Sequence, residues 1–153
     1  HSNGGFMAHR MACNQSNRIA AIVSLAGTTY SDSKSCKPTS PVSVLQIHGN
    51  NDAVILYTGG YLLSSAYPSA RKTIDLWGKI NECGKEPNSI LPRLDLDKKL
   101  AGAETTVLRY KGCKAGVTSE LWTINKGKHS PEFSATFAKS VVGFLLNHPK
   151  KSV

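Results

Sequence analysis

Three residues whose side chains can cooperate in nucleophilic catalysis occur along the chain in the order Ser2, Asp52 and His129. A serine hydroxyl is a weak nucleophile until a neighbouring base removes its proton. We expect His129 to be that base, and Asp52 to fix the tautomer of His129 and stabilise its protonated form. These residue types therefore predict a catalytic triad that attacks a carbonyl carbon.

The segment around Ser2 is typical of a nucleophile elbow. Residues 1–5 read HSNGG and match the pattern G-x-S-x-G except for its first glycine. In that pattern the serine lies on a strained turn at the start of a helix. The backbone N–H of Asn3 would then face the substrate oxyanion. A serine that only caps a helix before two glycines is the alternative interpretation.

The other two residues follow apolar segments that resemble buried strands. Asp52 ends the sequence HGNND, and His129 ends the sequence GKH before the last helix. An Asx-turn is the alternative role for Asp52, and an ordinary surface position is the alternative for His129. We expect His48 to be structural, and His9 and His148 to be surface residues on helices.

The hydrophobic pattern predicts an α/β protein, with a mostly parallel sheet flanked by helices. In such sheets, functional sites lie at the carboxyl ends of the strands. Residues 86–102 fit neither pattern. The expected helices are Gly4–Asn14, a segment from Pro68 to Asn81, and Pro131–Asn147, and the expected strands are Arg18–Leu25, Val42–Ile47, Thr105–Tyr110 and Glu120–Ile124.

Length and charge limit the function classes. The chain has 153 residues, enough for one domain with a buried core, and no apolar run is long enough to cross a bilayer. Its net charge is +9, but the basic residues are scattered and form no nucleic-acid motif. We therefore expect no nucleic-acid or membrane partner, with an anionic polymer as the alternative. No pattern predicts a metal or another cofactor.

The four cysteines, Cys13, Cys36, Cys83 and Cys113, form no C-x-x-C motif, which argues against zinc and thioredoxin-like sites. Three pairings are possible. Two disulfides would indicate a periplasmic or extracellular protein, whereas four buried thiols would indicate a cytosolic one.

Five segments carry a resemblance to a known family. They are SNGGFMAHR from Ser2, RIAAIVSLAG from Arg18, VLQIHGNND from Val44, WGKINECG from Trp77 and LWTINKGKH from Leu121. In this order they resemble the polyhydroxybutyrate depolymerase and feruloyl esterase-like family of secreted α/β-hydrolases, over nearly the whole chain.

The resemblance implies an α/β-hydrolase fold with the triad Ser2, Asp52 and His129, and the disulfides Cys13–Cys36 and Cys83–Cys113. It also implies a secreted or periplasmic serine esterase that works through an acyl-enzyme without a cofactor. The expected substrates, some of them polymeric, are feruloyl or acetyl polysaccharide esters, polyhydroxybutyrate or short acyl esters.

Two departures from the family pattern lead to further expectations. Residues 1–153 correspond to the C-terminal half of one catalytic domain that begins at the nucleophile elbow, so we expect the N-terminal half to be a separate segment or chain. Around the histidine the family has G-G-H-x-W-P, whereas this chain has Lys128 before His129 and lacks the tryptophan. A catalytically silent polymer- or carbohydrate-binding module of the same fold is therefore the alternative function.

Overall fold

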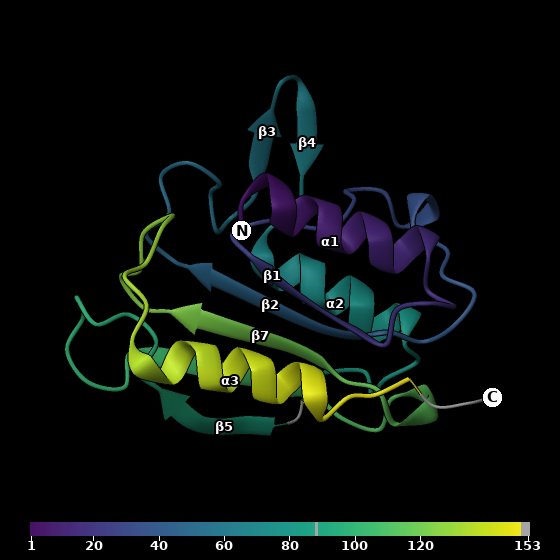
Figure 1. The fold of residues 1–153 in the computed structure, drawn as a ribbon. Coiled ribbons are helices and arrows are strands. Elements are labelled where there is room, and N and C mark those ends of the chain that lie inside the picture. The colour runs from purple at the N-terminus through teal and green to yellow at the C-terminus, as the bar shows by residue number, and fades with distance from the viewer. Residues whose placement is uncertain (88, 151–153) are drawn as a thin grey trace.

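A five-stranded sheet lies between helices in the computed structural model, which describes residues 1–87 and 89–150 (Figure 1). The helices are α1 (Asn3–Asn14), α2 (Ala70–Ile80) and α3 (Ala135–Leu146). In spatial order the strands of the sheet are β1 (Ala21–Leu25), β2 (Ser43–Gly49), β7 (Ser119–Ile124), β6 (Thr105–Tyr110) and β5 (Ser89–Leu94). The smaller elements are the hairpin of β3 (Gly60–Leu62) and β4 (Ser65–Tyr67) and the 3₁₀ turns Ser33–Ser35 and Lys114–Gly116.

The sheet confirms the α/β class, but it is mixed rather than mostly parallel. Strands β1, β2 and β7 pair in parallel, whereas β6 is antiparallel to both of its neighbours. The connection from β6 to β7 is too short for the helical crossover that parallel neighbours need. The expectation of a mostly parallel sheet overlooked that limit.

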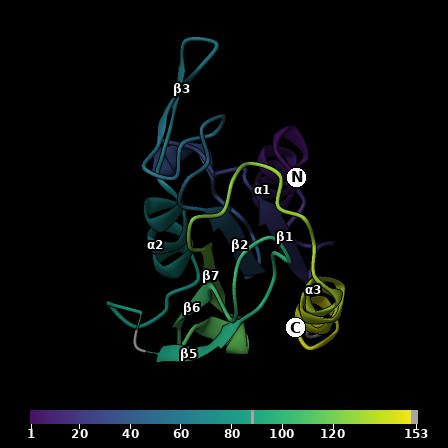
Figure 2. The same ribbon diagram turned by 90° about the vertical axis from the view of Figure 1, so that its left-hand side faces the viewer.

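Alternation along β2 divides the core into two layers. Val44 packs with Trp77 of α2 on one face, and Leu45 packs with Phe144 of α3 on the other. Figure 2 shows α2 and α3 on opposite sides of the sheet. The side chains of Gln46 and His48 share the face of Val44, because residues two apart in a strand point the same way. That face is also covered by α1.

Local capping explains where two helices begin. The Ser69 hydroxyl accepts a hydrogen bond from the Lys72 N–H, which starts α2 just after Pro68. The Ser134 hydroxyl likewise accepts from the Thr136 N–H, so α3 begins at Ala135 and not at Pro131 as the apolar pattern predicted.

Both expected disulfides are present, and there are no free cysteines. Cys13–Cys36 links the end of α1 to the loop between β1 and β2. Cys83–Cys113 joins the segment after α2 to the segment after β6. Closing loops of this length stabilises the folded chain by roughly 3 kcal/mol per bridge. Two disulfides are typical of an oxidising compartment.

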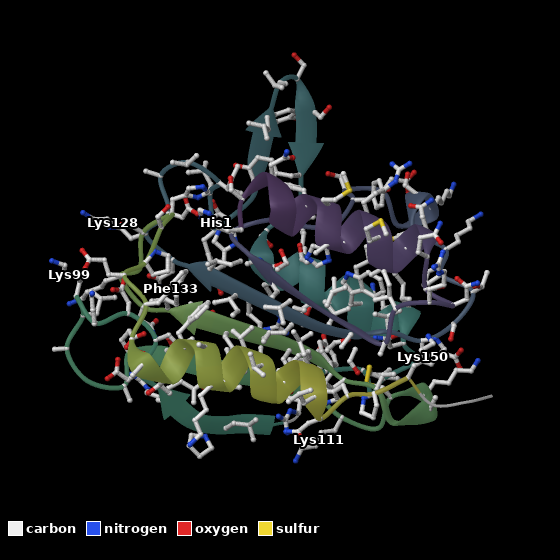
Figure 3. All side chains as sticks on the ribbon, in the orientation of Figure 1. His1, Lys99, Lys111, Lys128, Phe133 and Lys150 are labelled. Atoms are coloured by element: carbon white, nitrogen blue, oxygen red, sulfur yellow. A yellow bond between two sulfur atoms is a disulfide. The ribbon has the colours of Figure 1, made fainter. Side chains whose placement is uncertain are left out.

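The labelled lysines lie on two sides of the molecule. Figure 3 shows Lys99 and Lys128 at the left, and Lys111 and Lys150 toward the lower right. Within residues 1–87 and 89–150, none of the helices has the length and apolar character needed to cross a bilayer.

Candidate active site

Ser2 lies on a strained turn at the carboxyl end of β1. Its N–H donates to the Leu25 carbonyl over 2.8 Å, and its own carbonyl accepts from the N–H of Gly5 and of Phe6 as α1 begins. Its φ and ψ are 53° and −121°, a conformation that a non-glycine residue adopts only under strain. A nucleophile elbow has this geometry, and the side chain of a plain helix cap would instead accept a hydrogen bond, which that of Ser2 does not.

Two glycines let α1 start directly against β1. A Cβ on Gly27 would clash with the backbone of Gly5 and Phe6, and one on Gly5 would lie 2.8 Å from Ser24 Oγ. Larger residues at either position would push the start of α1, and Ser2 with it, away from the sheet.

Asp52 is buried and accepts hydrogen bonds on both carboxylate oxygens. Oδ1 accepts from the backbone N–H groups of Val54 and Ile55, at 2.8 and 2.9 Å. Oδ2 lies 2.8 Å from His129 Nδ1. The carboxylate therefore closes an Asx-turn with one oxygen and contacts His129 with the other, so the turn does not compete with the expected contact to a histidine.

The loops that carry Asp52 and His129 pack backbone to backbone. The Asn51 N–H donates to the Gly127 carbonyl over 2.9 Å, and the Asn50 side chain accepts from the Lys126 N–H over 2.7 Å. A Cβ on Gly49 would clash with the Gly127 carbonyl, so this approach requires glycine. Because β2 and β7 are parallel neighbours, their carboxyl ends bring the two loops to the same edge of the sheet.

His129 is 17% exposed and lies beside the start of α1. Its ring centroid is 4.8 Å from that of His1, and His1 Nε2 bonds the His129 carbonyl over 2.8 Å. Among the described residues, no hydrogen bond reaches His129 Nε2, and none joins that atom to the Ser2 hydroxyl. The ring nitrogen that faces away from Asp52 is therefore free to accept a proton. Such bonds are often open in enzymes without substrate.

The N–H of Asn3, the expected oxyanion donor, is unbonded within the described part of the chain. It belongs to the first turn of α1, where backbone N–H groups lack partners inside the helix and carry partial positive charge. An anion next to Ser2 would therefore be stabilised here.

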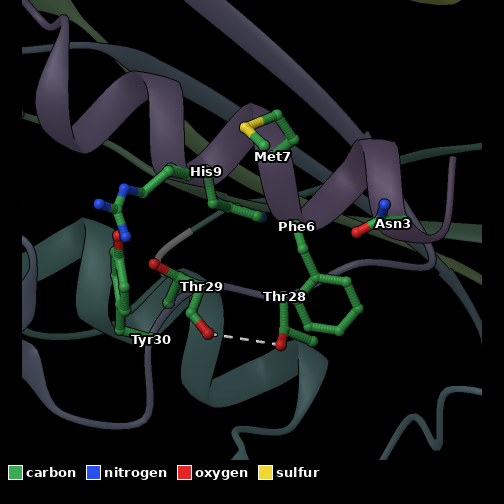
Figure 4. A pocket seen from close by; sticks show the side chains of 8 residues that line it. Asn3, Phe6, Met7, His9, Thr28, Thr29 and Tyr30 are labelled. Atoms are coloured by element: carbon green, nitrogen blue, oxygen red, sulfur yellow. Dashed lines mark hydrogen bonds between the residues drawn. The ribbon is translucent and has the colours of Figure 1, made fainter. Parts of the chain in front are cut away.

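A cavity of about 220 Å³ opens beside Asn3, between α1 and the loop after β1 (Figure 4). Phe6 and Tyr30 contribute aromatic rings to its lining, and the Arg10 guanidinium lies 5.8 Å from the centre of the Tyr30 ring. Thr29 also lines the cavity, and its buried hydroxyl has no hydrogen-bond partner among the described residues.

His48 and His9 are both buried. His48 is fully buried, and its Nε2 lies 3.3 Å from Asp52 Oδ2. The expectation for His9 was wrong, because His9 is 1% exposed. It shares the inner face of α1 with Gly5, Ala12 and Cys13, and that helical spacing was the signal in the sequence. In the described residues no group of three or more His, Cys, Asp or Glu side chains could hold a metal ion.

No protein-family model matches the chain. The chain is similar to feruloyl esterase B of Piromyces equi, with 30% identity over 139 aligned residues, and the match covers 84% of this chain and 24% of that protein. It is also similar to feruloyl esterase D of Neurospora crassa, with 25% identity over 130 residues, 85% of this chain and 38% of that protein. Neither relative is named a polyhydroxybutyrate depolymerase. The chain therefore has distant relatives named feruloyl esterases, and it spans less than half the length of either.

Proposed function

We propose that this chain carries the triad of a serine carboxylic-ester hydrolase, with Ser2 as nucleophile, His129 as base and Asp52 as the acid that orients His129. One observation supports this most strongly. The 2.8 Å contact between Asp52 and His129 lies at the same sheet edge as the strained turn of Ser2. The names of the two distant relatives support ester hydrolysis.

The proposed reaction has two steps. His129 Nε2 takes the Ser2 proton as the serine oxygen bonds to the ester carbonyl carbon, and the Asn3 N–H stabilises the oxyanion. The protonated His129 then gives its proton to the leaving alcohol, and an acyl-enzyme remains. Water, activated by His129, attacks that acyl group, so that the acid is released and Ser2 regains its proton. Asp52 keeps the Nδ1 proton of His129 in place throughout.

The cavity beside Asn3 is the proposed place for part of the substrate. Its two aromatic rings suit an apolar or aromatic group. Feruloyl and acetyl esters of polysaccharides are the favoured substrates because of the names of the relatives. Polyhydroxybutyrate and short acyl esters stay within the proposal, since the same triad cleaves any reachable ester.

We further propose that the chain is the C-terminal half of an α/β-hydrolase domain. Strand β1 lies at the edge of the sheet, so its outer side can pair with a strand from an N-terminal half, as a separate segment or chain. The two disulfides support a secreted or periplasmic location.

Hydrolysis of methyl ferulate and of a 4-nitrophenyl acyl ester tests the function. Ser2→Ala should abolish turnover of both esters without changing thermal stability, because this side chain makes no hydrogen bond in the described structure. Ser130→Ala is the matched control, since Ser130 is an exposed serine beside His129. Loss of activity in Ser130→Ala alone would favour another nucleophile. A wild-type protein that binds polysaccharide but hydrolyses neither ester would favour a silent binding module.

A further inference from the structure

A series of hydrogen bonds runs through buried side chains from α2 to His48, whose ring lies beside Asp52. Trp77 Nε1 lies 3.0 Å from His9 Nδ1, and His9 Nε2 lies 2.9 Å from Gln46 Oε1. Gln46 Nε2 lies 3.4 Å from His48 Nδ1, and His48 Nε2 lies 3.3 Å from Asp52 Oδ2. These contacts thus connect α2, α1 and β2 with the candidate site.

The first member of the chain sets the direction of every later bond. The Trp77 indole can only donate, so His9 Nδ1 must accept and His9 Nε2 must carry the proton. That proton goes to Gln46 Oε1, which turns the amide nitrogen of Gln46 toward His48 Nδ1. His48 must then carry its proton on Nε2. All donors therefore point away from Trp77, and the last one, His48 Nε2, donates to the Ile55 carbonyl beside Asp52.

Other contacts hold the same arrangement. The Gln46 amide nitrogen also donates to the Gly27 carbonyl over 2.7 Å, so this amide cannot rotate without losing that bond. His48 Nε2 lies 2.8 Å from the Ile55 carbonyl, which again requires a proton on Nε2. Burial lowers the pKa of His9 to about 4 and also lowers the pKa of His48, so both rings are neutral near pH 7.

The four side chains are at most 1% exposed, although apolar residues could fill this layer without any need for partners. Buried polar networks are costly unless every member is satisfied. Here the network ends on the Ile55 carbonyl, which accepts the N–H of His48, and the Ile55 N–H in turn donates to Asp52 Oδ1. Asp52 Oδ2 contacts His129 Nδ1 and lies 3.3 Å from His48 Nε2.

We propose that Trp77, His9, Gln46 and His48 are positioning residues, which fix the N–H of His48 on the Ile55 carbonyl and so hold the turn whose Ile55 N–H binds Asp52, with the carboxylate in place for His129. This inference rests on the proposed function. Its central part, a directed chain with fixed tautomers, is a property of the folded protein and can be measured without substrate.

Few other titratable groups lie next to these hydrogen-bonded side chains. The ring of Tyr57 lies 5.7 Å from that of His48, and its hydroxyl bonds Thr123 Oγ1 of β7. His1 contacts the other side of His129, and Lys128 precedes it in the sequence. None of these groups takes part in the bonds between Trp77 and His48.

The first experiment is nitrogen–proton NMR of the imidazole rings in the folded wild-type chain near pH 7. We expect His9 and His48 each as one neutral tautomer with the proton on Nε2, and His129 with a proton on Nδ1. A proton on Nδ1 of His48, or two tautomers in exchange at His9, would overturn the inference. Absence of ester hydrolysis would overturn the proposed function and leave these tautomers unchanged, so the two failures are distinguishable.

The second experiment compares His48→Leu with His48→Gln in the active protein. Leucine removes the N–H that binds the Ile55 carbonyl beside Asp52, whereas the glutamine amide can restore it. We expect His48→Leu to lower kcat about tenfold, with KM nearly unchanged, and to move the acidic limb of the pH–rate profile to higher pH, because the Asp52 carboxylate loses a neighbouring N–H dipole and then favours protonated His129. His48→Gln should recover most of both changes. Equal kinetics in the two variants would show a packing role only.

Trp77, the residue of the hydrogen-bonded series farthest from Asp52, has a matched control on the opposite face of the sheet. Trp77→Phe removes the N–H donated to His9, whereas Trp122→Phe removes an N–H donated to Glu120, which has no link to Asp52. We expect two tautomers of His9 and a lower kcat only in Trp77→Phe. The same result for both tryptophans would mean that positioning of Asp52 does not extend to α2.

Discussion

Replacing Asp52 with asparagine tests the orienting role of the carboxylate, because the two side chains have the same shape but different donors. The carboxylate accepts from Val54 N, Ile55 N and His129 Nδ1 at 2.8, 2.9 and 2.8 Å. An asparagine has only one oxygen for these donors. If that oxygen keeps the two backbone bonds of the turn, the amide NH₂ faces His129 Nδ1.

His129 Nδ1 must then accept, and the imidazole proton moves to Nε2, the atom that should take the Ser2 proton. Turnover should therefore fall on the order of 10⁴-fold, which corresponds to about 5.5 kcal/mol of transition-state stabilisation, while the fold persists. The assay is kcat/KM for a 4-nitrophenyl acyl ester at pH 7, with thermal unfolding followed in parallel.

Asp97 provides the control for Asp52→Asn. It is also buried, and its Oδ1 accepts from the Lys99 and Glu132 N–H groups, but no histidine contacts it. Asp97→Asn should leave turnover within about twofold of wild type, since only a turn is affected. A folded Asp52→Asn variant that keeps more than about a tenth of wild-type turnover would refute the orienting role.

Two further predictions concern stability. Burial lowers the pKa of His9 from 6.5 to about 4, so between these pH values the unfolded chain binds a proton that the folded chain does not. The contribution of His9 to stability is therefore complete above pH 6.5 and is lost as the pH falls toward 4, by up to about 3 kcal/mol. Urea unfolding at pH 7 and pH 4.5 should show a smaller difference for His9→Gln than for wild type, and an equal difference would contradict the assignment. Gly27→Ala should destabilise the chain by about 1–3 kcal/mol, because its Cβ would lie 2.7 Å from Gly5 Cα, whereas Gly4→Ala meets open space and should cost nothing. Equal melting temperatures for these two variants would refute the close approach of α1 to β1.

Strong local signals made much of the fold predictable. Strand β2 is rich in Val, Leu and Ile and ends at Gly49, and α2 begins where Pro68 and Ser69 mark a helix start. The hairpin of β3 and β4 carries no such pattern, since Tyr61 and Leu63 are apolar yet 79% and 94% exposed. Strand β5 contains Pro92 and an irregular register, and its residues fitted neither periodicity.

The candidate site was predictable as a set of residues but not as a network. Asp52 and His129 could be paired because each follows a strand and chemistry requires an acid beside a base. The link from His9 to Gln46 joins α1 to β2, and no local pattern in either segment indicates it. Such long-range polar contacts depend on how the layers pack, which only the three-dimensional structure provides.

Covalent labelling of Ser2 tests the central claim most directly. A fluorophosphonate reacts with a serine only when a base and an oxyanion site activate it. Peptide mass spectrometry of the labelled protein should place the adduct on Ser2, with labelling abolished in Ser2→Ala and strongly slowed in His129→Ala. An adduct on another serine, or no adduct on the folded protein under conditions that label a control esterase, would contradict the assignment of Ser2 as the nucleophile.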